Sequence, residues 1–350
     1  MPEVPFDAIL VVSFGGPEGP DQVMPFLQNV LRGKNVPEAR MLEVAGHYQH
    51  FGGVSPINAQ NRELIAALEG ELRQNGLDLP IYFGNRNWDP LLPDTLRQMQ
   101  HDGIKNALGF FTSAFSSYSG CRQYRENILQ AQQTVGAEAP QVSKLRMFFN
   151  HPGYIESVTD RVTNALRDLQ VSPGEKFRLA FTAHSIPSAM AVNCRYEAQL
   201  RESCRLVVDA MNLPADCWDL VYQSRSGPAS QPWLEPDILD HLKSLNEQGI
   251  KKALISPIGF ISDHLEVLYD LDTEAAALSQ ELDMSMVRAG TVGTHPRFIR
   301  MIRELIEERI RPDSPRLALG SLGASHDVCP VDCCLSGRPA AGTSQNPRSS

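Results

Sequence analysis

The sequence predicts an α/β protein with two similar halves, each a parallel β-sheet flanked by helices. Short apolar runs rich in β-branched and aromatic residues alternate with longer segments of helical periodicity, as in parallel sheets. Part of the first half recurs in the second, because residues 102–108 (DGIKNAL) resemble residues 248–254 (QGIKKAL). A length of 350 residues also favours two domains over one.

Six apolar runs are the expected strands. The clearest are residues 8–13, 79–83, 177–183 and 252–258, and weaker ones are residues 105–111 and 220–223. The first run, with the turn that follows it, corresponds loosely to residues 179–185, since each is an apolar segment that ends in a short polar turn. This second similarity supports the two-half architecture, although common connectors between helices and strands also match by chance.

Helices are expected at residues 58–74, 154–169 and 301–310. The first has apolar residues at helical spacing and ends at Asn75-Gly76, a common C-terminal cap. The second has an apolar face and starts after His-Pro-Gly. The third carries Glu and Arg three and four residues apart, which is usual for a solvated helix face.

These elements predict an N-terminal α/β domain over residues 1–150 and a C-terminal α/β domain over residues 151–322. The repeated segments are about twenty residues further apart in the first half, which predicts an insertion at about residues 24–55. The last helix is expected to pack back on the first domain. Residues 323–350 are rich in Ser, Gly, Pro and Cys and predict a flexible tail, disordered over about its last ten residues.

Composition excludes several classes of protein. A net charge of −9 without a Lys/Arg block argues against a nucleic-acid partner. The N-terminus lacks the basic and apolar regions of a signal peptide, and no apolar stretch approaches the length of a membrane span. We therefore expect a cytoplasmic protein without a transmembrane segment. Seven cysteines, an odd number, do not predict a disulfide framework.

Two polar residues stand where predicted strands run out. His184 closes the run 177–183, and Glu266 follows the run 252–258, with His264 beside it. The carboxyl ends of parallel strands are where open α/β sheets bind ligands. An imidazole near its normal pKa can accept a proton at neutral pH. A histidine after a strand is often only structural, but together these residues predict a site that handles protons and a divalent metal.

Acidic residues continue from this site along the next predicted helix. Glu266, Asp270 and Glu274 are four residues apart and so share one helix face. Oxygen and imidazole ligands of this kind suit Fe²⁺ and similar ions. On a free helix, like charges at this spacing repel by roughly a few tenths of a kcal/mol per pair. A metal ion or shared protons between them would offset this repulsion. The alternative is an acidic helix face exposed to solvent.

Three further segments have the composition of binding loops. Residues 52–58 (GGVSPIN) place Ser55 as a helix cap next to two glycines, which allow close approach of a ligand. Residues 116–124 (SSYSGCRQY) are rich in hydroxyl groups, with Arg122 and Arg125 available for carboxylates. Trp233 lies in a Pro-rich loop, where it either closes the core or stacks on a flat ligand. A capped turn or a capped surface helix would explain the first two segments equally well.

Together these segments resemble the ferrochelatases, which insert Fe²⁺ into a porphyrin. The resemblance runs from about residue 8 to residue 324. It is most specific at residues 182–187 (TAHSIP), 262–266 (SDHLE) with 269–272 (YDLD), 52–56 (GGVSP) and 222–227 (YQSRSG). It implies two Rossmann-like, chelatase-type domains, with the insertion at about residues 24–55 covering the porphyrin.

The resemblance also implies roles for individual residues. His184 and Glu266 would be the catalytic and metal-binding residues, and Asp270, Glu274 and His264 would form the acidic line for protons. The porphyrin would be bound by Ser55, Tyr124, Arg32, Tyr48 and Trp233. A planar porphyrin hides its nitrogen lone pairs, so we expect it to bind distorted, with two pyrrole protons leaving as iron enters.

Residues 13–20 and 118–124 are most similar to the bacterial, actinobacterial-like branch of the family. That branch uses coproporphyrin III, so the expected product is Fe-coproporphyrin III (coprohaem), and haem-pathway enzymes are expected partners for porphyrin delivery and coprohaem transfer. Two positions differ from relatives: Glu18 replaces a tyrosine that can ligate the product iron, and His47 replaces an arginine of the pocket lip. The resemblance therefore assigns no residue as the axial ligand of the product iron.

Several alternatives remain open at this stage. Protoporphyrin IX is the second candidate substrate, with protohaem as its product. A cobalt or nickel chelatase would use similar ligands. A non-enzymatic tetrapyrrole carrier could share the fold without needing His184 and Glu266 together. A two-domain solute-binding protein fits less well, since no export signal is present.

Cys329, Cys333 and Cys334 resemble the C-terminal cysteines that hold a [2Fe–2S] cluster in some ferrochelatases. Such a cluster requires four thiolates, and this part of the chain supplies three. In cluster-bearing relatives the fourth lies near the start of the helix at residue 154, where this chain has Ser157. The possible substitutes are Cys121, Cys194, Cys204, Cys217 and His326. Zinc binding and free thiols are the alternatives.

Overall fold

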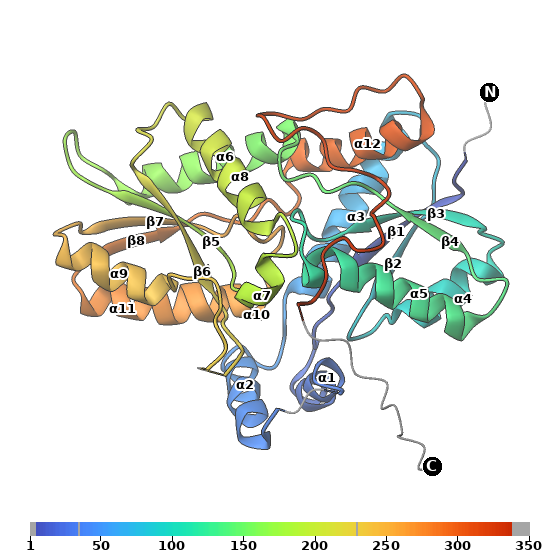
Figure 1. Cartoon of the computed structure of the whole chain (residues 1–350), viewed down its shortest axis with the longest axis horizontal. Coiled ribbons are helices and arrows are strands. Elements are labelled where there is room, and N and C mark those ends of the chain that lie inside the picture. The colour runs from blue at the N-terminus through green and yellow to red at the C-terminus, as the bar shows by residue number, and fades with distance from the viewer. Residues whose placement is uncertain (1–4, 34–35, 229, 338–350) are drawn as a thin grey trace, which may run out of the picture.

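The computed structural model describes residues 5–33, 36–228 and 230–337. Most of the predicted disordered end of the tail lies outside these residues. The described chain forms two sheets side by side, each covered by helices, with a pair of helices projecting below the gap between them (Figure 1). We call the elements around the first sheet the first half and those around the second sheet the second half.

Both sheets are parallel and have the same strand order. The first runs β2-β1-β3-β4, with β1 (Ala8–Ser13), β2 (Ile81–Asn85), β3 (Asn106–Phe111) and β4 (Gln141–Lys144). The second runs β6-β5-β7-β8, with β5 (Arg178–His184), β6 (Trp218–Gln223), β7 (Lys252–Ser256) and β8 (Ser285–Arg288). β1 and β5 hold equivalent places, as do β3 and β7. The predicted fold class of two similar α/β halves is confirmed.

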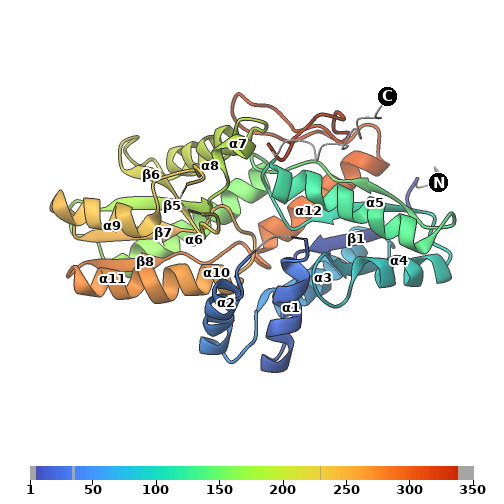
Figure 2. The same ribbon diagram turned by 60° about the horizontal axis from the view of Figure 1, so that its bottom comes forward.

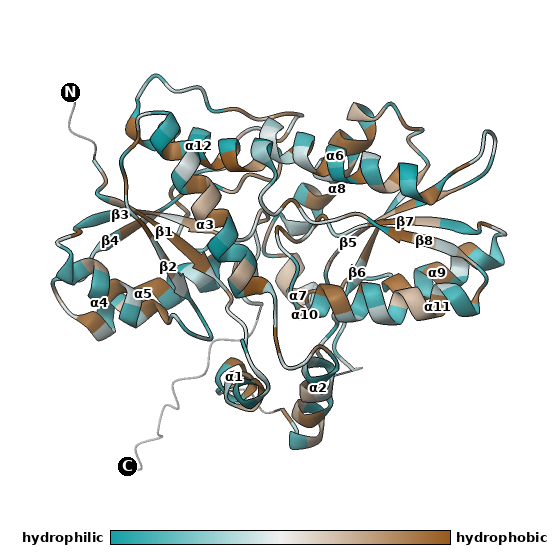
Figure 3. Cartoon of the chain, turned by 180° about the vertical axis from the view of Figure 1, so that it is seen from behind, coloured by the Kyte–Doolittle hydropathy of each residue, from teal (hydrophilic) through white to brown (hydrophobic). Residues whose placement is uncertain are grey.

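Helices cover both faces of each sheet and turn their apolar sides inward (Figure 3). In the first half they are α3 (Ile57–Gln74), α4 (Leu92–His101) and α5 (Gln123–Val135), and the same half carries α1 (Val23–Val30) and α2 (Glu38–His50), which lie away from its sheet. In the second half they are α6 (Pro152–Leu169), α7 (Ser188–Ala191), α8 (Tyr196–Ala210), α9 (Ile238–Glu247), α10 (Leu265–Val267) and α11 (Ala276–Glu281). A 3₁₀ turn η1 (Pro20–Gln22), π-turns η2 (Tyr118–Arg122) and η3 (Leu268–Ala275), and α12 (Pro296–Ile310) complete the chain.

The insertion expected at about residues 24–55 corresponds to α1 and α2. Both helices project together from the body of the molecule, next to the gap between the two halves (Figure 2). They have a small core of their own, in which Phe26 packs edge-on against Tyr48 at 5.7 Å and against Trp88 at 6.0 Å. Leu265, at the start of α10, joins the same cluster, so the insertion contacts the second half.

The helix expected at residues 301–310 begins five residues earlier, at Pro296. The imidazole of His295 accepts a hydrogen bond from the backbone N–H of Arg297, and Pro296 occupies the first turn. Histidine is not among the usual capping residues, which is why the sequence pattern missed this start. The longer helix reaches both α3 and α6.

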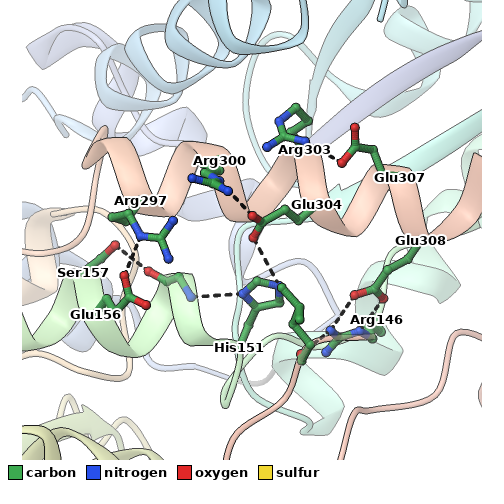
Figure 4. A network of polar contacts seen from close by, with 12 residues as sticks. Arg146, His151, Glu156, Ser157, Arg297, Arg300, Arg303, Glu304, Glu307 and Glu308 are labelled. Carbon is green, nitrogen blue, oxygen red and sulfur yellow. Dashed lines mark hydrogen bonds and ion pairs between the residues drawn. The ribbon is translucent and has the colours of Figure 1, made fainter. Parts of the chain in front are cut away.

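α12 connects the two halves through buried charges (Figure 4). Arg303 donates to Glu71 of α3 at 2.7 Å. Arg146, after β4, makes a two-pronged ion pair with Glu308 at 2.7 and 2.8 Å, and both side chains are only 1% exposed. His151 accepts the N–H of Gly153 at Nδ1, which leaves Nε2 as the protonated nitrogen, 3.7 Å from Glu304. Burial lowers the pKa of His151 to about 3, so this ring is neutral.

Substitution of Glu308 by glutamine is expected to destabilise the protein by about 3–5 kcal/mol, because it leaves the buried Arg146 charge without its counterion. Urea unfolding followed by circular dichroism measures the change. Asp94→Asn is the control, since Asp94 pairs with Arg97 at the surface and its loss should barely move the midpoint. Equal midpoints for both variants would show that the buried pair contributes nothing net.

Within the described residues, no helix combines the length and the apolar character that crossing a bilayer requires.

Candidate active site

His184 and Glu266 meet at the carboxyl end of the second sheet. His184 is the last residue of β5, and Glu266 lies in α10, which follows β7, the neighbour of β5. The imidazole Nε2 lies 3.5 Å from a carboxylate oxygen, with the two side chains 34% and 50% exposed. The structure therefore brings together the two residues predicted to carry the chemistry, and leaves both accessible.

The backbone fixes the orientation of His184. Its Nδ1 lies 2.5 Å from the carbonyl oxygen of Ser185, so Nδ1 carries the hydrogen and donates it. In the neutral ring Nε2 then has a free lone pair directed toward Glu266. Two electron-pair donors face one another across 3.5 Å, an arrangement that a proton or a metal ion between them would stabilise.

A glycine allows the loop after β7 to approach β5 closely. Gly259 donates its N–H to the carbonyl of Thr182 at 3.0 Å, and a Cβ at this position would lie 2.7 Å from the Cα of Ala183. This contact sets the start of the segment that carries Glu266 against the strand that carries His184. The glycine in the apolar run before Glu266 therefore has a structural cause.

His264 caps the helix start beside Glu266. Its Nδ1 accepts the backbone N–H of Glu266 at 3.2 Å and lies 3.9 Å from the Glu266 carboxylate, while its ring packs edge-on against Phe260. Desolvation lowers the pKa of His264 against the opposing effect of the Glu266 charge, and the nearby His184 lowers it further. It is thus a neutral imidazole at the mouth of the acidic line.

The acidic residues after Glu266 lie on a π-helix, where the sequence pattern predicted an ordinary helix. Each turn of η3 (Leu268–Ala275) is wider than an α-helical turn, so residues four apart lie more nearly above one another. Such π-segments are concentrated at functional sites. The predicted shared face of Glu266, Asp270 and Glu274 therefore persists, on a different backbone.

Asp270 is the half-buried member of this line, whereas Glu266 and Glu274 are exposed. Its carboxylate accepts hydrogen bonds from the hydroxyl of Ser224 and, at 3.2 Å, from the amide of Gln223. Burial, reinforced by repulsion from Glu266 and Glu274, raises the pKa of Asp270 to about 7 despite the Ser224 hydrogen bond. The pKa of Glu274 is also raised, chiefly by burial. A carboxyl group poised near neutrality can both accept and release a proton.

The sequence analysis placed Gln223 and Ser224 in the motif 222–227 but assigned neither of them a role in the site. Gln223 is the last residue of β6 and pairs in register with His184 on β5. The rule that ligands bind at the carboxyl ends of parallel strands would have selected both residues, had the neighbour of β5 been known. Their polar side chains at the end of an apolar run were the available signal.

The insertion and the second half meet beside this site. His47 of α2 stacks on Tyr269 of η3, with ring centroids 3.7 Å apart and planes 10° from parallel. Tyr48 is buried, and its pKa is raised first by burial and then by the charge of Glu266. Ser55 is also buried, and its N–H donates to Pro17. Trp233 lies against Gly227 and forms a bridge with Pro187, beside the turn after His184.

Two other residues expected to bind the porphyrin, Tyr124 and Arg32, differ in their exposure to solvent. Tyr124 is buried, stacked on Phe111 at 5.2 Å, with the guanidinium of Arg86 4.5 Å above its ring. Arg32, just beyond α1, is exposed. Glu18 pairs with Arg62, which lowers the pKa of Glu18 and gives this acidic residue a structural partner.

The tail cysteines gather near Cys121 rather than near Ser157. Donor atoms of His326, Cys329 and Cys333 lie within 4.8 Å of one another, and the Cys333 and Cys334 sulfurs are 3.3 Å apart. A hydrogen bond from Cys121, helped by the charges of Lys144 and Arg125, lowers the pKa of Cys329. Arg122, expected to meet substrate carboxylates, instead donates to the carbonyls of Val331 and Cys333 in the tail.

Comparison with known proteins decides the family. A profile of the family described as Ferrochelatase matches residues 6–310. The chain belongs to the ferrochelatase family. A ferrochelatase from Rhodopirellula baltica is 62% identical over 332 residues, covering 95% of this chain and 94% of the relative. A coproporphyrin III ferrochelatase from Streptomyces griseus is 49% identical, covering 98% and 97%, and another from Nocardia farcinica is 49% identical, covering 96% and 98%.

Solved structures of a more distant chelatase share the fold. SirB from Bacillus subtilis with Fe³⁺ superimposes with a TM-score of 0.52 at 14% identity, covering 89% of this chain and 98% of SirB. The cobalt complex of sirohydrochlorin chelatase SirB gives 0.50 at 10% identity, with the same coverage. At this level of identity the similarity concerns the fold alone, and it supports the chelatase-type architecture of this ferrochelatase.

Proposed function

We propose that the protein inserts Fe²⁺ into coproporphyrin III to give Fe-coproporphyrin III (coprohaem), with release of two protons. The observation that carries the proposal is the pairing of His184 Nε2 with Glu266 at 3.5 Å, at the head of a line of carboxyl groups. Family membership supports the reaction type. The names of the relatives from Streptomyces and Nocardia support coproporphyrin III over protoporphyrin IX.

In the proposed mechanism His184 accepts a pyrrole proton. Its Nε2 carries the free lone pair because Nδ1–H is held by the Ser185 carbonyl. The Glu266 carboxylate stabilises the resulting imidazolium and offers an oxygen ligand to the incoming Fe²⁺. When two porphyrin N–H protons have left, two Fe–N bonds have taken the places of the N–H bonds.

Asp270 and Glu274 then serve as the route for protons between the site and the surface. Asp270, with a pKa of about 7, exchanges a proton near neutral pH, and Ser224 and Gln223 hold its carboxylate in place. His264 stays neutral and fixes the helix start. The insertion α1–α2, with Tyr48 in its core, would cover the porphyrin, and Ser55, Arg32, Tyr124 and Trp233 would help to bind it.

Parallel anaerobic assays with coproporphyrin III and protoporphyrin IX test this proposal. We expect Fe²⁺ insertion into coproporphyrin III to exceed insertion into protoporphyrin IX by at least about tenfold in kcat/KM, which corresponds to about 1.4 kcal/mol of transition-state discrimination. The reverse preference would keep the mechanism and assign protohaem as the product. Tight porphyrin binding without insertion would instead identify a carrier.

We also propose that the tail cysteines bind a [2Fe–2S] cluster. Three tail thiols close together, with Lys144 and Arg125 nearby, suit the thiolate requirement and the negative charge of such a cluster. When bound, the cluster would supply one-electron redox chemistry.

We place the protein in the cytoplasm, where its reaction would be linked to the haem-pathway enzymes that supply porphyrin and take up coprohaem.

A further inference from the structure

We infer that Cys121 supplies the fourth thiolate to the three tail cysteines, and that the cluster so formed fastens residues 319–337 across both halves of the molecule. The inference rests on the proposed [2Fe–2S] cluster and goes beyond it, because it assigns the missing ligand and a structural consequence of its use. Zinc bound by the same donors is an outcome of the test described below.

The local backbone directs Cys121 toward the tail. Cys121 lies in the π-turn η2, where the Ser117 hydroxyl accepts the N–H of Gly120 at 2.8 Å and so caps the turn. The Cys121 side chain is only 2% exposed and belongs to a buried cluster against which Cys329 packs. A thiol held inside a π-turn and facing another thiol is already oriented for a shared ligand.

Two of the other candidates for a fourth thiolate lie apart from the tail cysteines, and two compete with Cys121. Cys194 follows α7 and donates to the carbonyls of Met190 and Ala191, but it lies close enough to Cys333 and Cys334 to interact with their charges, so it is a competitor. Cys204 is fully buried in α8, next to Tyr154. Cys217 lies beside Arg178 and Asp216 at the start of β6. His326, with Nε2 4.0 Å from the Cys333 sulfur, is the second competitor.

Positive charge surrounds the cysteine group. A cavity of about 280 Å³ next to Cys329 is lined by three cations, Arg125, Lys144 and Arg309, which outnumber the single acid, Asp327. Lys144 is buried and donates to the carbonyl of His326 at 2.9 Å, while the Nε of Arg125 is buried without a hydrogen-bond partner among the described residues. Four thiolates with two ferric ions and two sulfides form a dianion, which these cations would neutralise.

The tail that carries the cysteines touches both halves of the molecule, and Figure 1 shows it in dark red crossing between them. In the first half, Arg122 donates to Val331 and Cys333 at 2.7 and 2.9 Å. In the second half, Ser321 donates to Glu202 of α8 at 3.0 Å.

The end of the described tail rests on α7. A Cβ on Gly337 would lie 2.2 Å from the carbonyl oxygen of Ala189, so the backbones touch and only glycine fits. Since α7 begins just after the turn that presents His184, anchoring the tail to Cys121 would hold α7 and η2 at a fixed distance. The consequence is a more rigid wall beside the active site.

Anaerobic reconstitution of the full-length protein with Fe³⁺ and sulfide, and in parallel with Zn²⁺, tests the ligand assignment. Iron and acid-labile sulfide content and the visible absorption of the cluster are compared in wild type, Cys121→Ser, Cys121→Ala, Cys194→Ser, His326→Ala and the control Cys217→Ser. We expect cluster content to fall at least about tenfold in both Cys121 variants and to stay near wild type in the other three. Circular dichroism establishes that each variant is folded.

Hydrogen exchange of α7 and residues 319–337 tests the fastening. Loading of the wild type is expected to slow exchange in both segments, and Gly337→Ala should abolish the effect on α7 while the cluster still forms. A cluster retained without Cys121, or lost with His326, overturns the ligand assignment. A wild type that takes up only zinc, or nothing, overturns the cluster and this inference, while iron insertion in the porphyrin assay remains a separate result. Unchanged exchange in α7 overturns the fastening.

Discussion

Replacing His184 with alanine is expected to slow iron insertion by about 10²–10⁴-fold, the usual contribution of a general base, while porphyrin binding changes little. The reason is geometric. The Nε2 atom of His184 carries the lone pair that faces the Glu266 carboxylate. The other ring nitrogen, Nδ1, is held in a hydrogen bond to the Ser185 carbonyl, so the ring cannot turn Nδ1 toward the site. Steady-state anaerobic assays give the rate, and quenching of porphyrin or protein fluorescence gives the binding constant.

Two further variants make this result specific. Glu266→Gln keeps the size of the side chain but removes its charge, and we expect it to lower kcat and to raise the Fe²⁺ concentration needed for half-maximal rate. His101→Ala, at an exposed position at the end of α4, should behave like wild type. If His184→Ala lost porphyrin binding in proportion to its rate, His184 would be a binding residue and another group would accept the proton.

The sequence could predict the pair His184 and Glu266 because both follow apolar runs whose parallel pairing was foreseeable. It could not supply the details that depend on register. Gln223 and Ser224 reach Asp270 only because β6 pairs with β5, a neighbour relationship that no local pattern encodes. Acidic residues four apart fit an α-helix as well as a π-helix, so η3 was unforeseeable too.

The strands that the sequence did not reveal are at the sheet edges. β4 and β8 each have four residues with much exposed surface, so they lack the long apolar run that marked β1 and β5. The proximity of Cys121 to the tail cysteines could not be predicted either, because it depends on the tail returning to the first half after α12. Long-range packing of this kind is decided by tertiary contacts rather than by local preference.

Asp270→Asn is expected to flatten the pH dependence of both stability and activity. In the wild type the pKa of Asp270 is raised from 3.8 to about 7, so between these values the folded protein binds more protons than the unfolded chain. Stability therefore falls as pH rises through that interval, by an amount on the order of 4 kcal/mol at most, and levels off above pH 7 or so. The asparagine variant lacks this loss, so it should gain stability relative to wild type at pH 8, as measured by urea unfolding.

The pH dependence of activity should also report the ionisation of Asp270. Below its pKa, Asp270 is protonated and cannot accept a proton from the site, so the rate of iron insertion should rise with pH through about 7 and this limb should vanish in Asp270→Asn. Ser224→Ala removes a hydrogen bond that favours the carboxylate, so it should move the limb to higher pH. Glu281→Gln, at an exposed acid on α11, is the control in the same buffers. A rate limb that stays in place in both active-site variants would remove Asp270 from the proton route.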